Sequence, residues 1–154
     1  MKSIISANKK NITNKLSGIL CDEYILLTKT KNAYRNLLSS DFQDEYQFFK
    51  AQSNEIDLII AHVEKRVSDL GSYADAMLKA LLKVTRFNKK KNKIKDSTSC
   101  LQELLNDHET LIAKLKSNTP LLANVSQENQ SDDFITILTE SHQKMVWFLR
   151  SYLK

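Results

Sequence analysis

The chain has 154 residues, 42% of them hydrophobic and 27% charged, with a formal net charge of +5 at pH 7. This length suits one domain, which can bury about two-thirds of the surface that the unfolded chain exposes. No run approaches the roughly 18 apolar residues of a membrane span, and the N-terminal segment lacks the apolar stretch of a secretion signal. The two cysteines are isolated from each other, as in proteins of a reducing compartment. We therefore expect a cytoplasmic protein outside membranes.

The charge is distributed unevenly along the chain. All 18 acidic residues lie outside two segments, residues 1–15 and 86–95, which hold ten of the 23 basic residues. Such basic segments on an acidic body are typical of proteins that bind a polyanion, although solvated lysine runs also serve solubility alone. We predict non-specific DNA contacts from Lys2, Lys9, Lys10, Lys15, Arg86, Lys89, Lys90, Lys91, Lys93 and Lys95.

The composition favours an all-α fold, because two glycines and one proline leave little turn punctuation. After a basic tail over residues 1–13, apolar residues at helical spacing predict a first helix from about Asn14 to Leu38. A heptad seam from Phe42 to Leu70 predicts the second helix, which Gly71 ends as a C′ glycine. Polar Gln52 and Ser53 interrupt this seam once.

Three further helices follow. A short helix is expected over residues 73–84, with residues 86–95 as a loop. Ser99 and Gln102 have the spacing of a capping box, which predicts the start of the next long helix, and Pro120 should kink or end it. Ser131 or Asp132 caps the last helix. Four long helices with a long connection between the second and third predict a four-helix bundle of ferritin-like arrangement, with the short helix in the crossover.

Several stretches together resemble the Dps family, the DNA-binding proteins from starved cells, within the ferritin-like superfamily. LSGILCDEYILLTKTKNAYRN is similar to the family's first helix, EKRVSDLG to the end of its second, and LNDHETLIAKL and SHQKMVWFLRSYL to its third and fourth. The resemblance covers residues 14–154. It implies a homo-oligomeric cage, expected to be a dodecamer, in which iron is oxidised between two subunits.

The resemblance also places the iron-oxidising site on residues that do not suit iron. Its two histidines fall on Tyr34 and Tyr46, with Arg35 in place of a neighbouring tryptophan, and its three carboxylates fall on Lys50, Ala61 and Lys65. An ammonium group has no lone pair for a metal and repels a cation. The two tyrosines suit iron(III) only as phenolates, and aromatic packing at a subunit interface is their simpler role. We therefore expect a degenerate ferroxidase centre and leave enzyme activity open, with the balance against it.

Two lysines at that interface call for acidic partners, and Asp22, Glu23, Asp44 and Glu45 are the candidates; otherwise both ammonium groups reach water along their stems. No Glu-x-x-His occurs in the chain. His108 and His142 fit hydrogen-bonded core histidines, and we assign no histidine to a metal.

Two other features of the family resemblance concern the core and the pores. Trp147 matches the family's helix-four tryptophan, and we expect it in the core. Asp132 and Asp133 are candidate pore acids, although acids at a helix start also complement its dipole.

Three functions remain open. The first is a Dps-like cage, associated with the nucleoid and the stress response, that protects DNA without a working conventional ferroxidase centre. The second is an iron-sequestering or iron-oxidising mini-ferritin with a non-standard site, with iron in its cavity or pores and a role in iron homeostasis. The third is a structural subunit that co-assembles with an intact paralogue. No cofactor follows with certainty from the residues.

Overall fold

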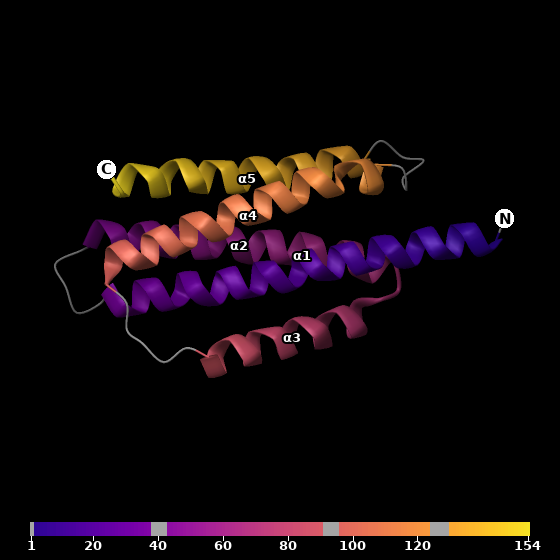
Figure 1. Cartoon of the computed structure of the whole chain (residues 1–154), viewed down its shortest axis with the longest axis horizontal. Coiled ribbons are helices and arrows are strands. Elements are labelled where there is room, and N and C mark those ends of the chain that lie inside the picture. The colour runs from indigo at the N-terminus through magenta and orange to yellow at the C-terminus, as the bar shows by residue number, and fades with distance from the viewer. Residues whose placement is uncertain (1, 38–42, 91–95, 124–129) are drawn as a thin grey trace.

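The computed structural model describes residues 2–37, 43–90, 96–123 and 130–154, which form five helices and no strand (Figure 1). In chain order they are α1 (Lys2–Leu37), α2 (Gln43–Asp69), α3 (Tyr73–Lys90), α4 (Ser97–Ala123) and α5 (Gln130–Tyr152). The all-α prediction is confirmed. No helix in these ranges combines the length and the apolar character needed to cross a membrane.

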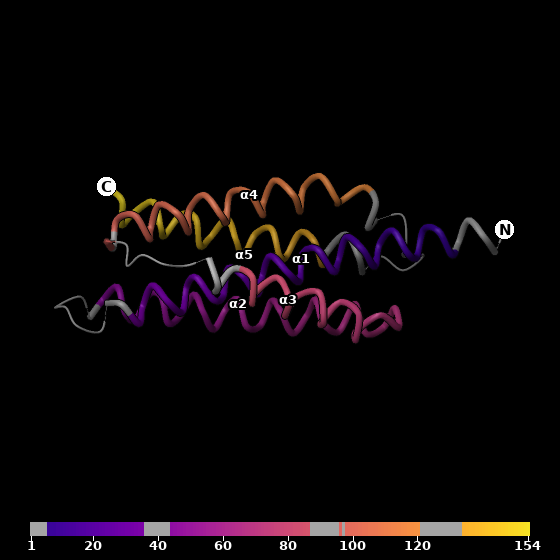
Figure 2. The backbone as a smooth tube through the Cα atoms, turned by 60° about the horizontal axis from the view of Figure 1, so that its bottom comes forward, coloured from indigo at the N-terminus to yellow at the C-terminus, as the bar shows by residue number. Residues whose placement is uncertain are grey.

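Helices α1, α2, α4 and α5 form a bundle, and α3 lies outside it. α1 packs along α2, α4 packs along α5, and α1 also contacts α4. α3 rests mainly on α1, on the side away from α4 and α5 (Figures 1 and 2). This is the predicted bundle with an extra helix in the connection between its second and third long helices.

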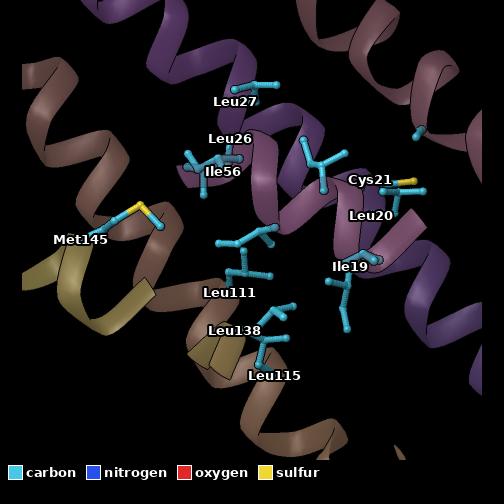
Figure 3. Close-up of a cluster of buried hydrophobic side chains, with 14 of the residues drawn as sticks. Ile19, Leu20, Cys21, Leu26, Leu27, Ile56, Leu111, Leu115, Leu138 and Met145 are labelled. Atoms are coloured by element: carbon cyan, nitrogen blue, oxygen red, sulfur yellow. The ribbon is translucent and has the colours of Figure 1, made fainter. Parts of the chain in front are cut away.

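The core is one cluster to which all the bundle helices contribute. Figure 3 shows its centre, where Ile19 and Leu20 of α1, Ile56 of α2, Leu115 of α4 and Leu138 of α5 converge. Each of these side chains is at most 1% exposed. Because the seam residues recur every three or four positions, one face of each helix supplies them. The apolar stripes read from the sequence are therefore the core faces.

Two helices are longer than predicted. α1 begins at Lys2 rather than near Asn14, and residues 6–11 are exposed before the buried Ile12. α3 continues to Lys90 rather than ending near residue 84, so the first part of the predicted basic loop is helical. Lysine and asparagine add no apolar stripe, but they continue a helix once it is nucleated, which explains both extensions.

The ends of α2 and α4 show how the chain sets its boundaries. Gly71 has φ 73°, and its N–H and that of Ser72 donate to the carbonyls of Ser68 and Val67, which is the predicted glycine stop in Schellman form. At the start of α4, Asp96 accepts hydrogen bonds from both the backbone N–H and the hydroxyl of Ser99, at 2.9 and 2.7 Å. The predicted Ser99 capping box is therefore wrong, because the cap is the aspartate three residues earlier.

Two other expectations for single residues are also corrected. α4 continues through Pro120 to Ala123, so the proline does not end the helix, whereas the alternative of a kink stays a prediction. Trp147, expected in the core, is 67% exposed in the single chain. It contacts Phe148 edge to face on the outer side of α5. Its helical position falls between the buried Met145 and Leu149 rather than on their stripe.

Candidate functional site

The two tyrosines at the positions where the family resemblance places iron-binding histidines meet in the structure. The rings of Tyr34 on α1 and Tyr46 on α2 are 5.5 Å apart between centroids and 84° apart in plane, an edge-to-face contact. Both are half-buried. Such a contact exploits the positive edge and negative face of the rings, so it packs the ends of α1 and α2 together. The prediction placed this aromatic packing at a subunit interface, and the contact seen here lies within one chain.

The other three positions lie on the exposed side of α2. Lys50, Ala61 and Lys65 are all exposed in the single chain. Lys65 forms an ion pair with Asp69 one turn later, at 3.4 Å, on the surface of the same helix. Exposed pairs of this kind contribute little, because water and salt screen them. Within one chain, the five positions therefore form an aromatic contact beside a row of surface residues.

Two of the four acids proposed as partners for these lysines are engaged elsewhere. Asp22 pairs with Lys83 of α3 and Lys114 of α4. Glu23 is fully buried and accepts a hydrogen bond from His142. Neither is available to Lys50 or Lys65, so the expectation for Asp22 and Glu23 is wrong. These contacts could not be read from spacing, because they join helices far apart in the sequence.

A second link between α1 and α2 lies in the same interface as the tyrosine pair. Tyr24 donates its hydroxyl to Glu64 at 2.5 Å. Burial raises the pKa of Tyr24 above its ordinary value, and the hydrogen bond to the carboxylate adds to the shift. Together, the two contacts bind α1 to α2 along the face on which the resemblance places the iron site.

The predicted DNA-binding residues fall into two separate places. Lys9, Lys10 and Lys15 are exposed on α1, whose N-terminal end projects beyond the bundle (Figure 1). Arg86 is exposed near the C-terminal end of α3, which lies farther toward the opposite end. Lys2 belongs to α1, and Lys89 and Lys90 belong to α3. Among the residues that the structure describes, Arg86 and the lysines of α1 therefore do not form a single patch within one chain.

Other predicted site residues are only partly described. Lys91, Lys93 and Lys95 lie outside the described residues. Asp132 and Asp133, the candidate pore acids, belong to the first turns of α5, and only their helical backbone is described.

Three buried polar side chains form a cluster in the core, and the sequence predicted only the two histidines among them. His142 Nε2 lies 2.7 Å from Oε1 of Glu23, and His142 Nδ1 lies 2.9 Å from Nδ1 of His108. All three side chains are 0% exposed. The prediction of hydrogen-bonded core histidines is confirmed. Glu23 could have been found as well, because it falls in step with Leu16, Leu20 and Leu27 on the apolar face of α1.

A further ion-pair cluster joins α1 to α4. Lys29 lies 3.0 Å from Glu103 and 2.6 Å from Asp107, with its side chain 16% exposed. Burial by itself lowers the pKa of Lys29, but its hydrogen bonds to the two carboxylates outweigh that effect, so the pKa is raised. The ammonium therefore stays charged and ties the helices together.

Metal binding has no ready site in the part of the chain that the structure describes. There, no group of three or more His, Cys, Asp or Glu side chains is arranged to hold a metal ion. In the buried cluster, both ring nitrogens of His142 already face a partner within the cluster.

Comparison with known proteins agrees with this architecture. A family model described as a ferritin-like domain matches residues 13–154. The chain belongs to the ferritin-like family. An uncharacterized low temperature-induced protein of Nostoc sp. is 26% identical over 146 residues, which cover 95% of this chain and 82% of that protein.

Solved structures of Dps proteins share the fold of this ferritin-like chain. Dps from Thermosynechococcus elongatus superimposes with a TM-score of 0.79 at 17% identity, covering 98% of this chain and 95% of the other. A Dps protein from Vibrio cholerae, described as a member of a superfamily of ferritin-like diiron-carboxylate proteins, has a TM-score of 0.76 at 18% identity, with 96% and 92% covered. At these identities the likeness establishes the fold, and function requires its own argument.

Proposed function

We propose that this chain assembles into a homo-oligomeric Dps-like cage that binds DNA without sequence preference and protects it, without a conventional ferroxidase centre. The observation that carries DNA binding is the set of exposed lysines in the N-terminal half of α1, Lys9, Lys10 and Lys15, on a helix whose N-terminal end projects beyond the bundle (Figure 1). Lysines that neutralise phosphates release counterions, which gives affinity for any DNA sequence. A cage repeats these lysines on every subunit, so weak contacts add through multivalency.

The helical form of this segment favours the proposal. The N-terminal lysines are fixed to a helix that continues into the bundle, so binding does not have to order a loose tail. Residues Ser6 to Asn11 are all exposed, which leaves their charged groups free to meet a phosphate backbone. Arg86 and the lysines that follow it would add a second contact from another subunit of the cage.

The absence of a conventional iron centre rests on residue chemistry. Two of the five ligand positions are lysines and one is alanine, and the two tyrosines pack against each other. Iron(II) prefers carboxylate and imidazole ligands, which these positions do not offer. In this proposal iron is a substrate that the cage does not oxidise efficiently.

DNA binding is tested by charge removal on α1. The variant Lys9→Ala, Lys10→Ala, Lys15→Ala should bind a random duplex more weakly in fluorescence anisotropy, with a shallower dependence of log affinity on log salt. The slope should fall by about 0.9 for each lost phosphate contact. The matched control removes three other exposed lysines, Lys116 of α4, Lys144 of α5 and Lys154 at the C-terminal end. Equal loss in both variants would refute a specific role for α1.

The iron alternative is tested on the same preparation. Demetallated protein is mixed with iron(II) in air, ferric absorbance is followed, and the assembly mass is recorded. Oxidation at the buffer rate by an intact assembly supports the proposal. Oxidation well above that rate would establish an iron-oxidising mini-ferritin with a site elsewhere, and a failure to assemble alone would favour co-assembly with a paralogue.

A further inference from the structure

A hydrogen-bonded triad of ionisable side chains crosses the core of the bundle. It runs from Glu23 on α1 through His142 on α5 to His108 on α4. α1 packs against α2, α3 and α4, whereas α5 packs against α4 and α2, so the contact between Glu23 and His142 spans the bundle diagonally. The triad therefore links three helices at one level, inside an apolar core.

The geometry limits how many protons the three side chains of the triad can hold. A carboxylate accepts, so His142 donates from Nε2 to Glu23. The two Nδ1 atoms are 2.9 Å apart, and a hydrogen bond of that length contains one proton. If both rings were imidazolium ions, two N–H groups would point at each other. Full protonation of the two histidines must therefore separate His142 from His108.

The outermost polar atom at each end of the triad also has no hydrogen-bond partner among the described residues. Oε2 of Glu23 and Nε2 of His108 are buried and make no hydrogen bond within the described part of the chain. A buried polar atom of this kind costs free energy, and a buried charge costs more. A proton added at Nε2 of His108 would place a charged donor in the apolar core without an acceptor.

Charged groups on the neighbouring helices have partners outside the triad. On α1 and α4, Asp22 pairs with Lys114 and with Lys83 of α3, and Asp107 pairs with Lys29. On α5, Arg150 pairs with Glu109 of α4. On α2, Glu64 accepts from Tyr24, and the buried polar residues Gln52 and Ser53 are uncharged.

We propose that Glu23, His142 and His108 form a pH-sensitive lock, which holds α1, α4 and α5 together at neutral pH and is released when acid forces a proton onto His108 in the core. The lock depends on the fold alone and not on the proposed DNA binding. Its effector is the proton, and its readout is the packing of the bundle.

The expected pH range follows from His108. Burial, and then the charge of neighbouring His142, lower the pKa of His108 from 6.5 to about 3. Between these values the unfolded chain binds the proton and the folded chain does not, so stability falls as the pH drops below about 6.5. One such group makes the folding equilibrium constant fall up to tenfold per pH unit. Surface carboxylates titrate mainly below about pH 4.5, so the window from pH 5 to 6.5 isolates histidine.

The first test compares unfolding by urea at several pH values between 5 and 8 in the full chain. His108→Gln should flatten the dependence by close to one proton, because the amide still donates to His142 but does not titrate. His62→Gln is the matched control, since His62 is exposed on α2. An unchanged slope in His108→Gln, or an equal change in both variants, would overturn the proposal.

The second test needs no variant. Histidine Cε1 hydrogen–deuterium exchange, followed by mass spectrometry of peptides from the unmodified protein, reports the protonation of each ring. The lock requires that His108 shows no titration midpoint between pH 5 and 8. A midpoint for His108 near 6.5 would show that the core accepts its proton freely, and the proposal would fail even if His108→Gln did not fold.

Discussion

The rings of Tyr34 and Tyr46 meet edge to face at 5.5 Å, at two positions where family resemblance places iron-binding histidines. The pair joins the C-terminal end of α1 to the first turns of α2. Its stability comes from ring packing, which needs neither hydroxyl. Within this chain the two rings therefore form a packing contact between α1 and α2.

Replacement of these tyrosines should separate packing from chemistry. Tyr34→Phe should leave the free energy of unfolding within about 0.5 kcal/mol, because the ring contact persists. Tyr34→Ala should cost about 1–3 kcal/mol, since it removes both the aromatic contact and half-buried apolar surface. Urea unfolding measures both. Equal losses in the two variants would mean that the hydroxyl, and not the ring, matters.

The Lys29 cluster should contribute more than an exposed pair on the same helix. Lys29→Ala should lower the free energy of unfolding by about 1–3 kcal/mol, because it removes the ammonium group that pairs with the half-buried carboxylates of Glu103 and Asp107. The matched change, Lys31→Ala, removes a more exposed pair with Asp57 and should cost less than about 1 kcal/mol.

The same cluster gives a pH dependence of known sign. The pKa of Lys29 is raised in the folded state. Its contribution is therefore fully present below the ordinary value near 10.5 and is lost as the pH rises through the folded value. The difference in unfolding free energy between the parent and Lys29→Ala should stay constant from pH 7 to 9. A difference that shrinks in this range would contradict the role assigned to the ammonium.

The bundle could be predicted because its helices carry seams of apolar residues at three- and four-residue steps. Gly71 could be predicted as a stop because only a positive φ closes that turn. The start of α1 could not, since residues 6–11 are all exposed and mark no helical face.

The candidate site was predictable only in part. Resemblance located Tyr34 and Tyr46, but their contact depends on how α1 and α2 pack. In the buried triad, His142 lies 34 positions from His108 and 119 positions from Glu23 in the sequence, so no local spacing predicts these contacts. Glu23 was expected at an interface as a candidate partner for Lys50 or Lys65, whereas its observed partner, His142, lies on another helix.

The interruption of the α2 seam gives another prediction. Ser53 is 2% exposed, and its hydroxyl makes no hydrogen bond within the described residues, whereas buried Ser17 donates to the carbonyl of Thr13 at 2.7 Å. Both serines are inside helices, so alanine improves helix propensity equally at each. Ser53→Ala should therefore be more stabilising than Ser17→Ala by about 1 kcal/mol. If the two changes match in thermal and urea unfolding, Ser53 has a partner in solution.

The cap of α4 provides the last prediction. Hydrogen bonds from the backbone N–H and then the hydroxyl of Ser99 lower the pKa of Asp96. Its contribution to stability is therefore present above the unfolded value near 3.9 and is lost as the pH falls through the folded value. Asp96→Ala should lower the thermal midpoint at pH 7, whereas Asp96→Asn, an equally good cap, should not.

The pH series then distinguishes a charged cap from a neutral one. As the pH falls toward 3, the thermal midpoints of the parent and Asp96→Ala should converge, because protonation weakens the acceptor that alanine lacks altogether. Asp96→Asn should keep its advantage over alanine at every pH, since its amide oxygen does not titrate. Circular dichroism at 222 nm follows all three proteins. A gap between the parent and Asp96→Ala that stays constant down to the acid transition would mean that the carboxylate charge contributes nothing, and that geometry alone caps α4.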